Sequence, residues 1–452
     1  MKKVDSVLCA IALMAIGITA VADDVSVTVY NSNLGVVREI RDLTFDKGDG
    51  MVSFVDVPSL IDATSVGFEL VDKSKSVMIL EQNYAYDLVS PSKIYEKYID
   101  RSIDVFNQDG QIFSGTLLSS SGGALVLREK SGKIQIIRMD QVVNVNFPEL
   151  PEGLITRPTL FWRYRSDFSG KAACQVSYQT SGLSWTAEYV GLLSDNEQTL
   201  GLTGWSSITN NSGATYKDAT LKLIAGDIHR VAQPRVRMME DAMYEKAMAP
   251  QAGAGFEEKA FFEYHMYTLP RKATIANNEI KQIALFDPAD ATVKKEYYFE
   301  PEKNNEKVRV VINFTNDKKD GLGIPLPAGR VRMFKKDTDG AMVLLGEDRI
   351  DHTPKDEEVK LTVGYAFDIT AEEKQTEYNR ISTRVEERTF EISLRNHKDE
   401  AVKVFIEKKL YGDWTITNSS HEFTSPDAVT LKYEIPVPAD GNVTVTFTVR
   451  TS

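Results

Sequence analysis

Val176 to Tyr189 reads Val-Ser-Tyr-Gln-Thr-Ser-Gly-Leu-Ser-Trp-Thr-Ala-Glu-Tyr, and Asn210 to Asp227 reads Asn-Asn-Ser-Gly-Ala-Thr-Tyr-Lys-Asp-Ala-Thr-Leu-Lys-Leu-Ile-Ala-Gly-Asp. Apolar and polar residues alternate here with the period of two that is typical of half-buried strands. Turns interrupt the alternation around Gly182, where glycine can take a positive φ, and at 210–213. The stretch therefore predicts the strands and turns of a β-sandwich.

The same alternation recurs on both sides of this stretch. It is clear at Val25, Val27 and Val29, and again in 308–314, 390–394 and 443–449. Between Ile103 and Phe147, five short apolar runs separated by Gly- and Ser-containing turns predict a small SH3/Sm-like barrel. A short helix from Pro91 to about Tyr98 is expected before it, because Ser90 can cap the helix and proline suits its first position.

These patterns predict an all-β protein of tandem, Ig-like β-sandwich domains with an inserted small barrel. The boundaries we expect are a signal peptide at 1–22, an N-terminal β domain at 23–90, the small barrel at 91–148, a β-sandwich at 149–231, a mobile Met/Ala/Gly-rich loop at 232–260 and a C-terminal β-sandwich region at 261–452. The methionines of the loop could bind a soft metal, but no Cys or His stands among them, so we favour a plain loop.

The N-terminus has the order of a secretory signal peptide. Lys2 and Lys3 precede an apolar run, and Ala20-Val21-Ala22 is followed by acidic residues, which predicts cleavage after Ala22 rather than a retained anchor. No later segment is apolar enough to cross a bilayer, so we expect an exported protein of the periplasm or outer surface, with no transmembrane span after cleavage. The formal charge of −12 argues against nucleic acid as a partner. Cys174 alternates with apolar neighbours and is predicted to be a buried, inert thiol.

Common catalytic and metal-binding signatures are absent from the sequence, and no cofactor is expected. Two places could hold a metal ion. Asp227 and His229 fall on one side of an extended chain, although we favour a strand-end turn with a solvated charge cluster. Asp348, Asp351 and His352 lie in an acidic stretch at 346–358 that could bind Ca²⁺. We favour the alternative that this loop bonds its own backbone.

Exposed aromatic rings could also stack on sugars. The four tryptophans, with many tyrosines, would serve if a row of them faced solvent. In sandwiches such residues more often anchor the core, and Trp185 and Trp205 stand in core-like runs. We therefore expect the tryptophans to be core residues.

From Leu160 to Ser452 the chain resembles the exported bacterial family known as domain of unknown function 4139. The resemblance rests on 177–227 and on several later runs, which are Tyr267-Thr-Leu-Pro, Lys281-Gln-Ile, Gly323-Ile-Pro-Leu-Pro-Ala-Gly-Arg-Val, Gly346-Glu-Asp, Ile350-Asp-His-Thr, Leu394-Arg-Asn-His and Val437-Pro-Ala. Mucoidy inhibitor proteins look similar in plan but carry a coiled coil where this chain has the predicted barrel, so a role of the coiled coil does not transfer. The resemblance implies no enzymatic activity and no catalytic residues.

The sequence thus leads to two expectations about function. The first is a non-enzymatic cell-envelope protein that binds or scaffolds envelope proteins or glycans. The alternative is a hydrolase that modifies polysaccharide with carboxylates of a surface cleft. A cleft with converging carboxylates would favour the enzyme, and exposed faces or edges would favour the scaffold.

Overall fold

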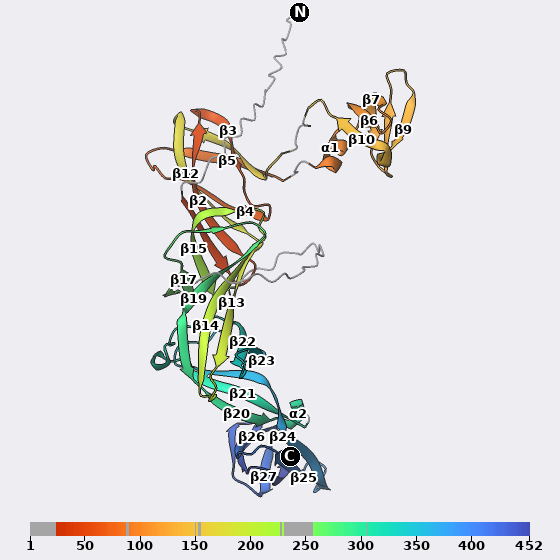
Figure 1. Ribbon diagram of the computed structural model, residues 1–452. Coiled ribbons are helices and arrows are strands. Elements are labelled where there is room, and N and C mark those ends of the chain that lie inside the picture. Colours follow the sequence, from red (N-terminus) through yellow and green to blue (C-terminus); the bar gives the residue numbers. More distant parts are fainter. Residues whose placement is uncertain are drawn as a thin grey trace, which may run out of the picture.

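A computed structural model describes residues 24–86, 90–149, 151, 155–226, 228–229, 256–304 and 306–452. Strands make up 66% of the structure and helices 3%, so the all-β class is confirmed. The sheets form a column, and a small domain stands beside it (Figure 1). The predicted signal peptide, Asp227 and residues 232–255 of the predicted loop lie outside the described residues. No helix in the described ranges is long and apolar enough to span a membrane.

Three sheets enclose the first and larger hydrophobic core. The eight-stranded sheet has the order β16 (Glu257–Phe261), β17 (Tyr264–Thr268), β15 (Tyr216–Ala225), β1 (Asp24–Tyr30), β2 (Gly35–Phe45), β12 (Gly170–Thr180) and β4 (Ile61–Leu70), with β18 (Ala273–Ile275) also on β15. A three-stranded sheet has the order β3 (Gly48–Val55), β11 (Thr159–Ser166) and β5 (Val77–Ala85). A five-stranded sheet has the order β19 (Glu279–Thr292), β14 (Thr199–Asn210), β13 (Leu183–Leu193), β22 (Gly329–Lys336) and β23 (Met342–Ile350).

This arrangement joins segments that the sequence had placed apart. The N-terminal strands β1, β2 and β4 lie in the same sheet as β12 and β15. Strand β1 pairs in parallel with β15, from Ser26 opposite Thr220 to Tyr30 opposite Ile224. Segments 23–90 and 149–231 therefore share one core, to which β17–β19, β22 and β23 also contribute. Residues 257–260, at the end of the predicted loop, belong to β16.

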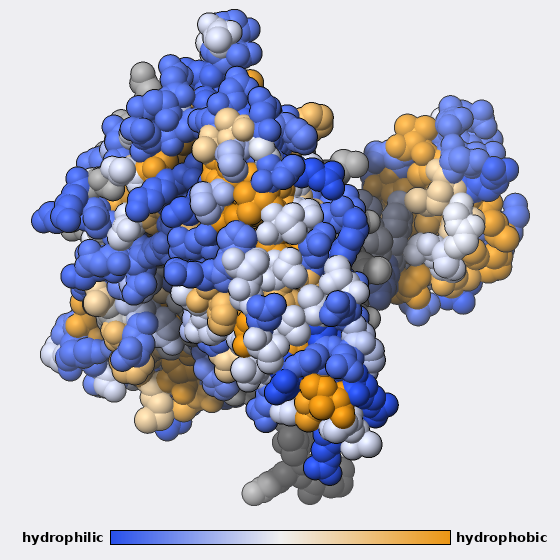
Figure 2. Space-filling model, turned by 90° about the horizontal axis from the view of Figure 1, so that it is seen from below, coloured by the Kyte–Doolittle hydropathy of each residue, from blue (hydrophilic) through white to orange (hydrophobic). Residues whose placement is uncertain are grey.

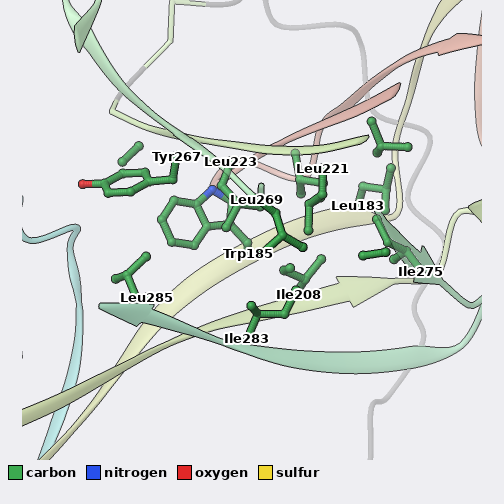
Figure 3. Packing of buried hydrophobic residues seen from close by; sticks show 14 of the residues in the cluster. Leu183, Trp185, Ile208, Leu221, Leu223, Tyr267, Leu269, Ile275, Ile283 and Leu285 are labelled. Atoms are coloured by element: carbon green, nitrogen blue, oxygen red, sulfur yellow. The ribbon is translucent and has the colours of Figure 1, made fainter. Parts of the chain in front are cut away.

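Trp185 is the centre of this core (Figure 3). Its side chain is 1% exposed, its Nε1 donates to the Ile224 carbonyl at 3.0 Å, and its ring meets Tyr267 edge-on at 6.1 Å between centroids. The two turns predicted around it carry the chain between layers: β12 and β13 lie in different sheets, and so do β14 and β15. The turns touch, because Asn211 N donates to Gly182 O at 2.7 Å. Gly182 has φ +81°, and a Cβ there would lie 2.7 Å from the Asn211 backbone.

A buried ion pair interrupts the apolar face of β2. Glu39 and Arg41 occupy core-facing positions between Val37 and Leu43 and are 4% and 8% exposed. Arg41 Nε donates to Glu39 Oε2 at 2.7 Å, and the Tyr178 hydroxyl donates to Glu39 Oε1. Burying a carboxylate is tolerable only with such partners.

A single curled sheet forms the second core. Its order is β27 (Trp414–Ser419), β30 (Gly441–Thr451), β25 (Glu386–Asn396), β24 (Glu358–Arg380), β21 (Lys307–Thr315), β20 (Lys294–Phe299), β26 (Val402–Lys409), β29 (Thr430–Val437) and β28 (Phe423–Asp427). The sheet folds over itself, since the rings of Tyr433 on β29 and Phe447 on β30 pack together at 5.8 Å between centroids, tilted by 39°. The short helices α2 (Pro301–Asn304) and η2 (Lys318–Asp320) flank β21.

Strands β21 and β24 run through both cores. Val308 lies in the second core, whereas Ile312 and Phe314 lie in the first. The register shifts between Val310 and Val311, where β24 has one residue more than β21. The alternation expected across 308–314 continues through this point, so the same face of β21 is buried in the second core at its start and in the first core at its end.

The inserted domain has its own core and lies beside the column in Figures 1 and 2. Helix α1 (Pro91–Lys97) begins as predicted, with Ser90 Oγ accepting from Lys93 N at 3.3 Å. The five predicted strands are present in the order β10 (Val142–Asn146), β6 (Ser102–Asn107), β7 (Ile112–Ser119), β8 (Ala124–Arg128) and β9 (Ile134–Arg138). The sheet is not closed, which corrects the expectation of a barrel on that point. The turn η1 (Met139–Gln141) leads from β9 to β10 without a hairpin, so these two strands remain the edges.

Candidate functional site

The three predicted ligands of the acidic stretch at 346–358 take part in hydrogen bonds that involve backbone groups. Asp348 lies on β23, where Oδ1 accepts from Arg349 N at 2.8 Å and Oδ2 accepts from Thr362 N at 2.6 Å. Asp348 thereby ties β23 to the crossing strand β24. His352 is exposed, and its Nδ1 accepts from Ala328 N at 3.1 Å. Asp351 is exposed, and its carbonyl accepts from the Thr353 hydroxyl at 2.9 Å.

One of the predicted metal-site residues, His352, lines a small pocket. Its volume is about 130 Å³, and its walls also include Gly226, which follows β15, and His265 on β17. His265 Nδ1 lies 2.8 Å from Glu258 Oε1. His229 is exposed, and Asp227 lies outside the described residues. Within the ranges that the structure describes, no group of three His, Cys, Asp or Glu side chains is placed to hold a metal ion.

A larger groove of about 780 Å³ lies where β21 and β24 pass between the cores. It is lined by Pro301, Glu306, Lys307, Tyr365, Ala366, Phe367, Ile369, Thr370, Glu372 and Glu373. Its volume is in the range of ordinary ligand sites. The groove arises from a wide bulge in β24. Arg309 pairs with Tyr365 and Lys307 pairs with Thr370, so between these two pairs β24 contains more residues than β21.

The bulge displays aromatic side chains. Phe367 is 94% exposed and Tyr365 is 52% exposed. Lys307 Nζ lies 5.5 Å from the centroid of the Tyr365 ring, a cation–π arrangement. An exposed phenylalanine held between two paired points of a strand is available to a ligand without further folding.

The carboxylates of the groove are engaged in ion pairs. Glu372 lies 2.9 Å from Lys374 Nζ and 3.2 Å from Arg395, and the hydrogen bond from Lys374 lowers the pKa of the Glu372 carboxyl. Glu373 lies 2.9 Å from Lys408 Nζ, and burial raises the pKa of Glu373 although Lys408 opposes this. Lys408 is buried and also contacts Glu302 at 2.9 Å.

A second ion-pair cluster stands on the other side of Phe367. Glu197 accepts hydrogen bonds from Lys295 and Lys335 beside a pocket of about 210 Å³ that Phe367 also lines. Burial acts to raise the pKa of Glu197, but the hydrogen bonds from the two lysines outweigh it and lower the pKa to about 2. Lys398 Nζ donates to the Tyr297 hydroxyl at 3.1 Å in the same place. This cluster fixes the loop after β13 to β20 and β22.

The tryptophans do not form a solvent-facing row. Trp162 and Trp185 are 0% and 1% exposed, as expected for core anchors. Trp205 is only partly buried and stands on the face of β14 opposite Leu202 and Ile208, so its assignment to the core is wrong. The exposed aromatics that line the larger groove are instead Tyr365 and Phe367, which sequence reasoning missed. Both share the parity of buried Ile369, so only the bulge reveals their exposure.

Comparisons with known proteins add little to this geometry. No family model and no curated protein match the chain. Among solved structures, one described as a "putative protease" from Parabacteroides distasonis ATCC 8503 aligns with 95% of this chain and 92% of its own, at 8% sequence identity and a TM-score of 0.11. A TM-score this low carries no argument about fold or function.

Proposed function

We propose that the protein is an exported, non-enzymatic binding or scaffold protein of the bacterial cell envelope and belongs to the uncharacterised family that its sequence resembles. The observation that carries the proposal is the groove at the β24 bulge. It presents Phe367 and Tyr365 to solvent, while Glu372 and Glu373 are held in ion pairs. Exposed aromatic area favours binding, whereas carboxylates engaged with cations are poorly placed to react.

Export is proposed from the signal-peptide pattern at 1–22. Fractionation of cells that express the full chain tests it, with mass spectrometry of the N-terminus. The expected product begins at Asp23 and is found outside the cytoplasm. An uncleaved chain in the cytoplasm would refute this part of the proposal.

Binding is tested by affinity capture with the protein starting at Asp23. The immobilised protein is exposed separately to protein and glycan fractions of the parent cell envelope, and a heat-unfolded sample serves as control. We expect saturable retention from one fraction by the folded protein only. Equal retention by the unfolded control, or none from either fraction, would refute the scaffold proposal.

The polysaccharide hydrolase is kept as a second candidate because of one observation. Glu372 and Glu373 both line the groove, and their pKa values shift in opposite directions, as an acid and a base would require. Consecutive residues of a strand point to opposite faces, however, which separates the two carboxylates. Reducing-end release from envelope polysaccharide, abolished by Glu373→Gln, would favour the enzyme. Equal release by wild type and Glu373→Gln would exclude this pair.

A further inference from the structure

We infer that the groove at the β24 bulge is a binding site for an uncharged oligosaccharide. This inference rests on the proposed binding function and names the chemical class of its ligand. It depends on the display of Phe367, on the balance of charge around the groove and on the polar groups that line it.

Phe367 has the properties of a stacking platform. The ring is 94% exposed, although its neighbour Ile369 is 1% exposed in the second core. Its backbone is held on both sides by the pairs Arg309 with Tyr365 and Lys307 with Thr370, so the ring is presented from a fixed point. A pyranose offers an apolar face of C–H groups that can lie flat on such a ring and remove it from water.

Tyr365 supplies a second ring in the same groove. Two residues along a chain are at most ~7 Å apart, so one ligand with several linked units can contact both rings. Lys307 lies against the Tyr365 ring and adds a hydrogen-bond donor beside it. The two rings therefore favour a chain-like ligand over a single compact molecule.

The charges around the groove cancel. The lining residues, their ion-pair partners and Glu302, which pairs with the partner Lys408, comprise four carboxylates and four cations. They are Glu302, Glu306, Glu372 and Glu373 with Lys307, Lys374, Arg395 and Lys408. A ligand of either charge would gain little net attraction and would have to displace existing pairs. This balance contrasts with the net charge of −12 for the whole chain and favours a neutral ligand.

The polar groups also suit hydroxyl recognition. Glu306 is exposed, lines the groove and makes no ion pair with another described residue. Thr370 offers a hydroxyl that both donates and accepts. Sugar hydroxyls likewise donate and accept hydrogen bonds, so acceptors and donors beside an aromatic ring can bind them. Once the sugar covers the rings, these polar groups fix the orientation of the ligand.

The test is isothermal titration calorimetry of the protein starting at Asp23 with cellohexaose, maltohexaose and the hexamer of N-acetylglucosamine. Hexagalacturonate and hexalysine are the charged comparators. We expect at least one neutral oligosaccharide to bind with an affinity that changes little with salt, because no net charge is neutralised. Phe367→Ala should weaken that binding by about tenfold, and Phe367→Tyr should retain it. Glu306→Gln should weaken it by a smaller factor.

Phe262→Ala is the matched control, because Phe262 is 85% exposed and lies between β16 and β17, away from the groove. Its binding should equal that of wild type. Binding of no neutral oligosaccharide, equal binding by Phe367→Ala, or binding of the charged comparators alone would each overturn the inference. If one of these results occurs while the folded protein still retains an envelope component, the scaffold proposal stands and only the ligand class is refuted.

Discussion

The buried pair of Glu39 and Arg41 allows a quantitative test of what holds the first core together. Arg41 is 8% exposed, donates to Glu39 at 2.7 Å and to the Val55 carbonyl at 2.6 Å, and lies 4.1 Å from the Phe54 ring centroid. Arg41→Met removes every one of these polar contacts. It leaves the Glu39 carboxylate, which is 4% exposed, with the Tyr178 hydroxyl as its remaining partner.

The cost follows from burial without a counter-charge. Removing one member of a buried ion pair destabilises a protein by about 3–5 kcal/mol, whereas replacing both members by apolar residues is often neutral or stabilising. We therefore expect Arg41→Met to lower the free energy of unfolding by about 3–5 kcal/mol. The triple variant Glu39→Leu/Arg41→Met/Tyr178→Phe should recover most of the loss, because it leaves no orphaned carboxylate or hydroxyl.

Urea unfolding followed by tryptophan fluorescence measures the effect, since Trp162 and Trp185 are buried in the same core and report its transition. Arg41→Met should shift the midpoint to clearly lower urea, and the triple variant should return it close to wild type. If both variants unfold at the same urea concentration, the loss comes from packing and not from the unpaired carboxylate.

Three further predictions concern pH, thiol chemistry and backbone strain. The pKa of Glu197 falls from 4.5 to about 2 on folding, so the ionised carboxylate stabilises the fold fully above pH 4.5, and this contribution is lost as the pH drops towards 2. Glu197→Gln should therefore lower the free energy of unfolding by about 1–2 kcal/mol at pH 7 after solvent screening. In urea titrations the difference between wild type and variant should disappear near pH 2. Burial raises the pKa of the Cys174 thiol to about 12, so a disulfide reagent at pH 8 should label it only in urea, and rapid labelling of the native protein would contradict its burial. Gly182→Ala should lower the free energy of unfolding by more than about 2 kcal/mol, because the φ of Gly182 is +81° and an added Cβ would meet the Asn211 backbone. Gly110→Ala, with φ +76° and open space around the added Cβ, should lower it by only about 1 kcal/mol. Equal shifts of the thermal midpoint in the two variants would refute the close approach at Gly182.

The strands of this protein are largely readable from local sequence. The alternation at Val25 to Val29 and at Val443 to Val449 predicted β1 and β30, and Ser90-Pro91 predicted the start of α1. Local pattern succeeds in these places because a strand with one buried face must alternate. It also holds at β21, where Val308, Ile312 and Phe314 are buried as the alternation predicts, but the sequence does not show that Val308 faces one core and the other two face another.

The candidate sites were less predictable. Asp348 and His352 were named as possible metal ligands, with backbone hydrogen bonding as the favoured alternative, and in the structure they accept hydrogen bonds from the backbone of Thr362 and Ala328. The exposure of Phe367 is not predictable from the sequence, because Phe367 shares the parity of the core residue Ile369 on β24. Exposure at one position of a strand depends on what packs opposite it, which no local window contains.

The sequence by itself determined that the chain is all-β, where most strands and turns fall, and that Cys174 and Trp185 are buried, because each follows from the two-residue period of a half-buried strand. Only the tertiary structure decided which strands share a sheet. It paired β1 with β15, which follows nearly two hundred residues later in the chain. It also buried an ion pair on the core-facing side of β2 and formed a groove at the β24 bulge. Pairing partners, buried charges and bulges depend on contacts between distant segments, and their energies appear only when those segments meet.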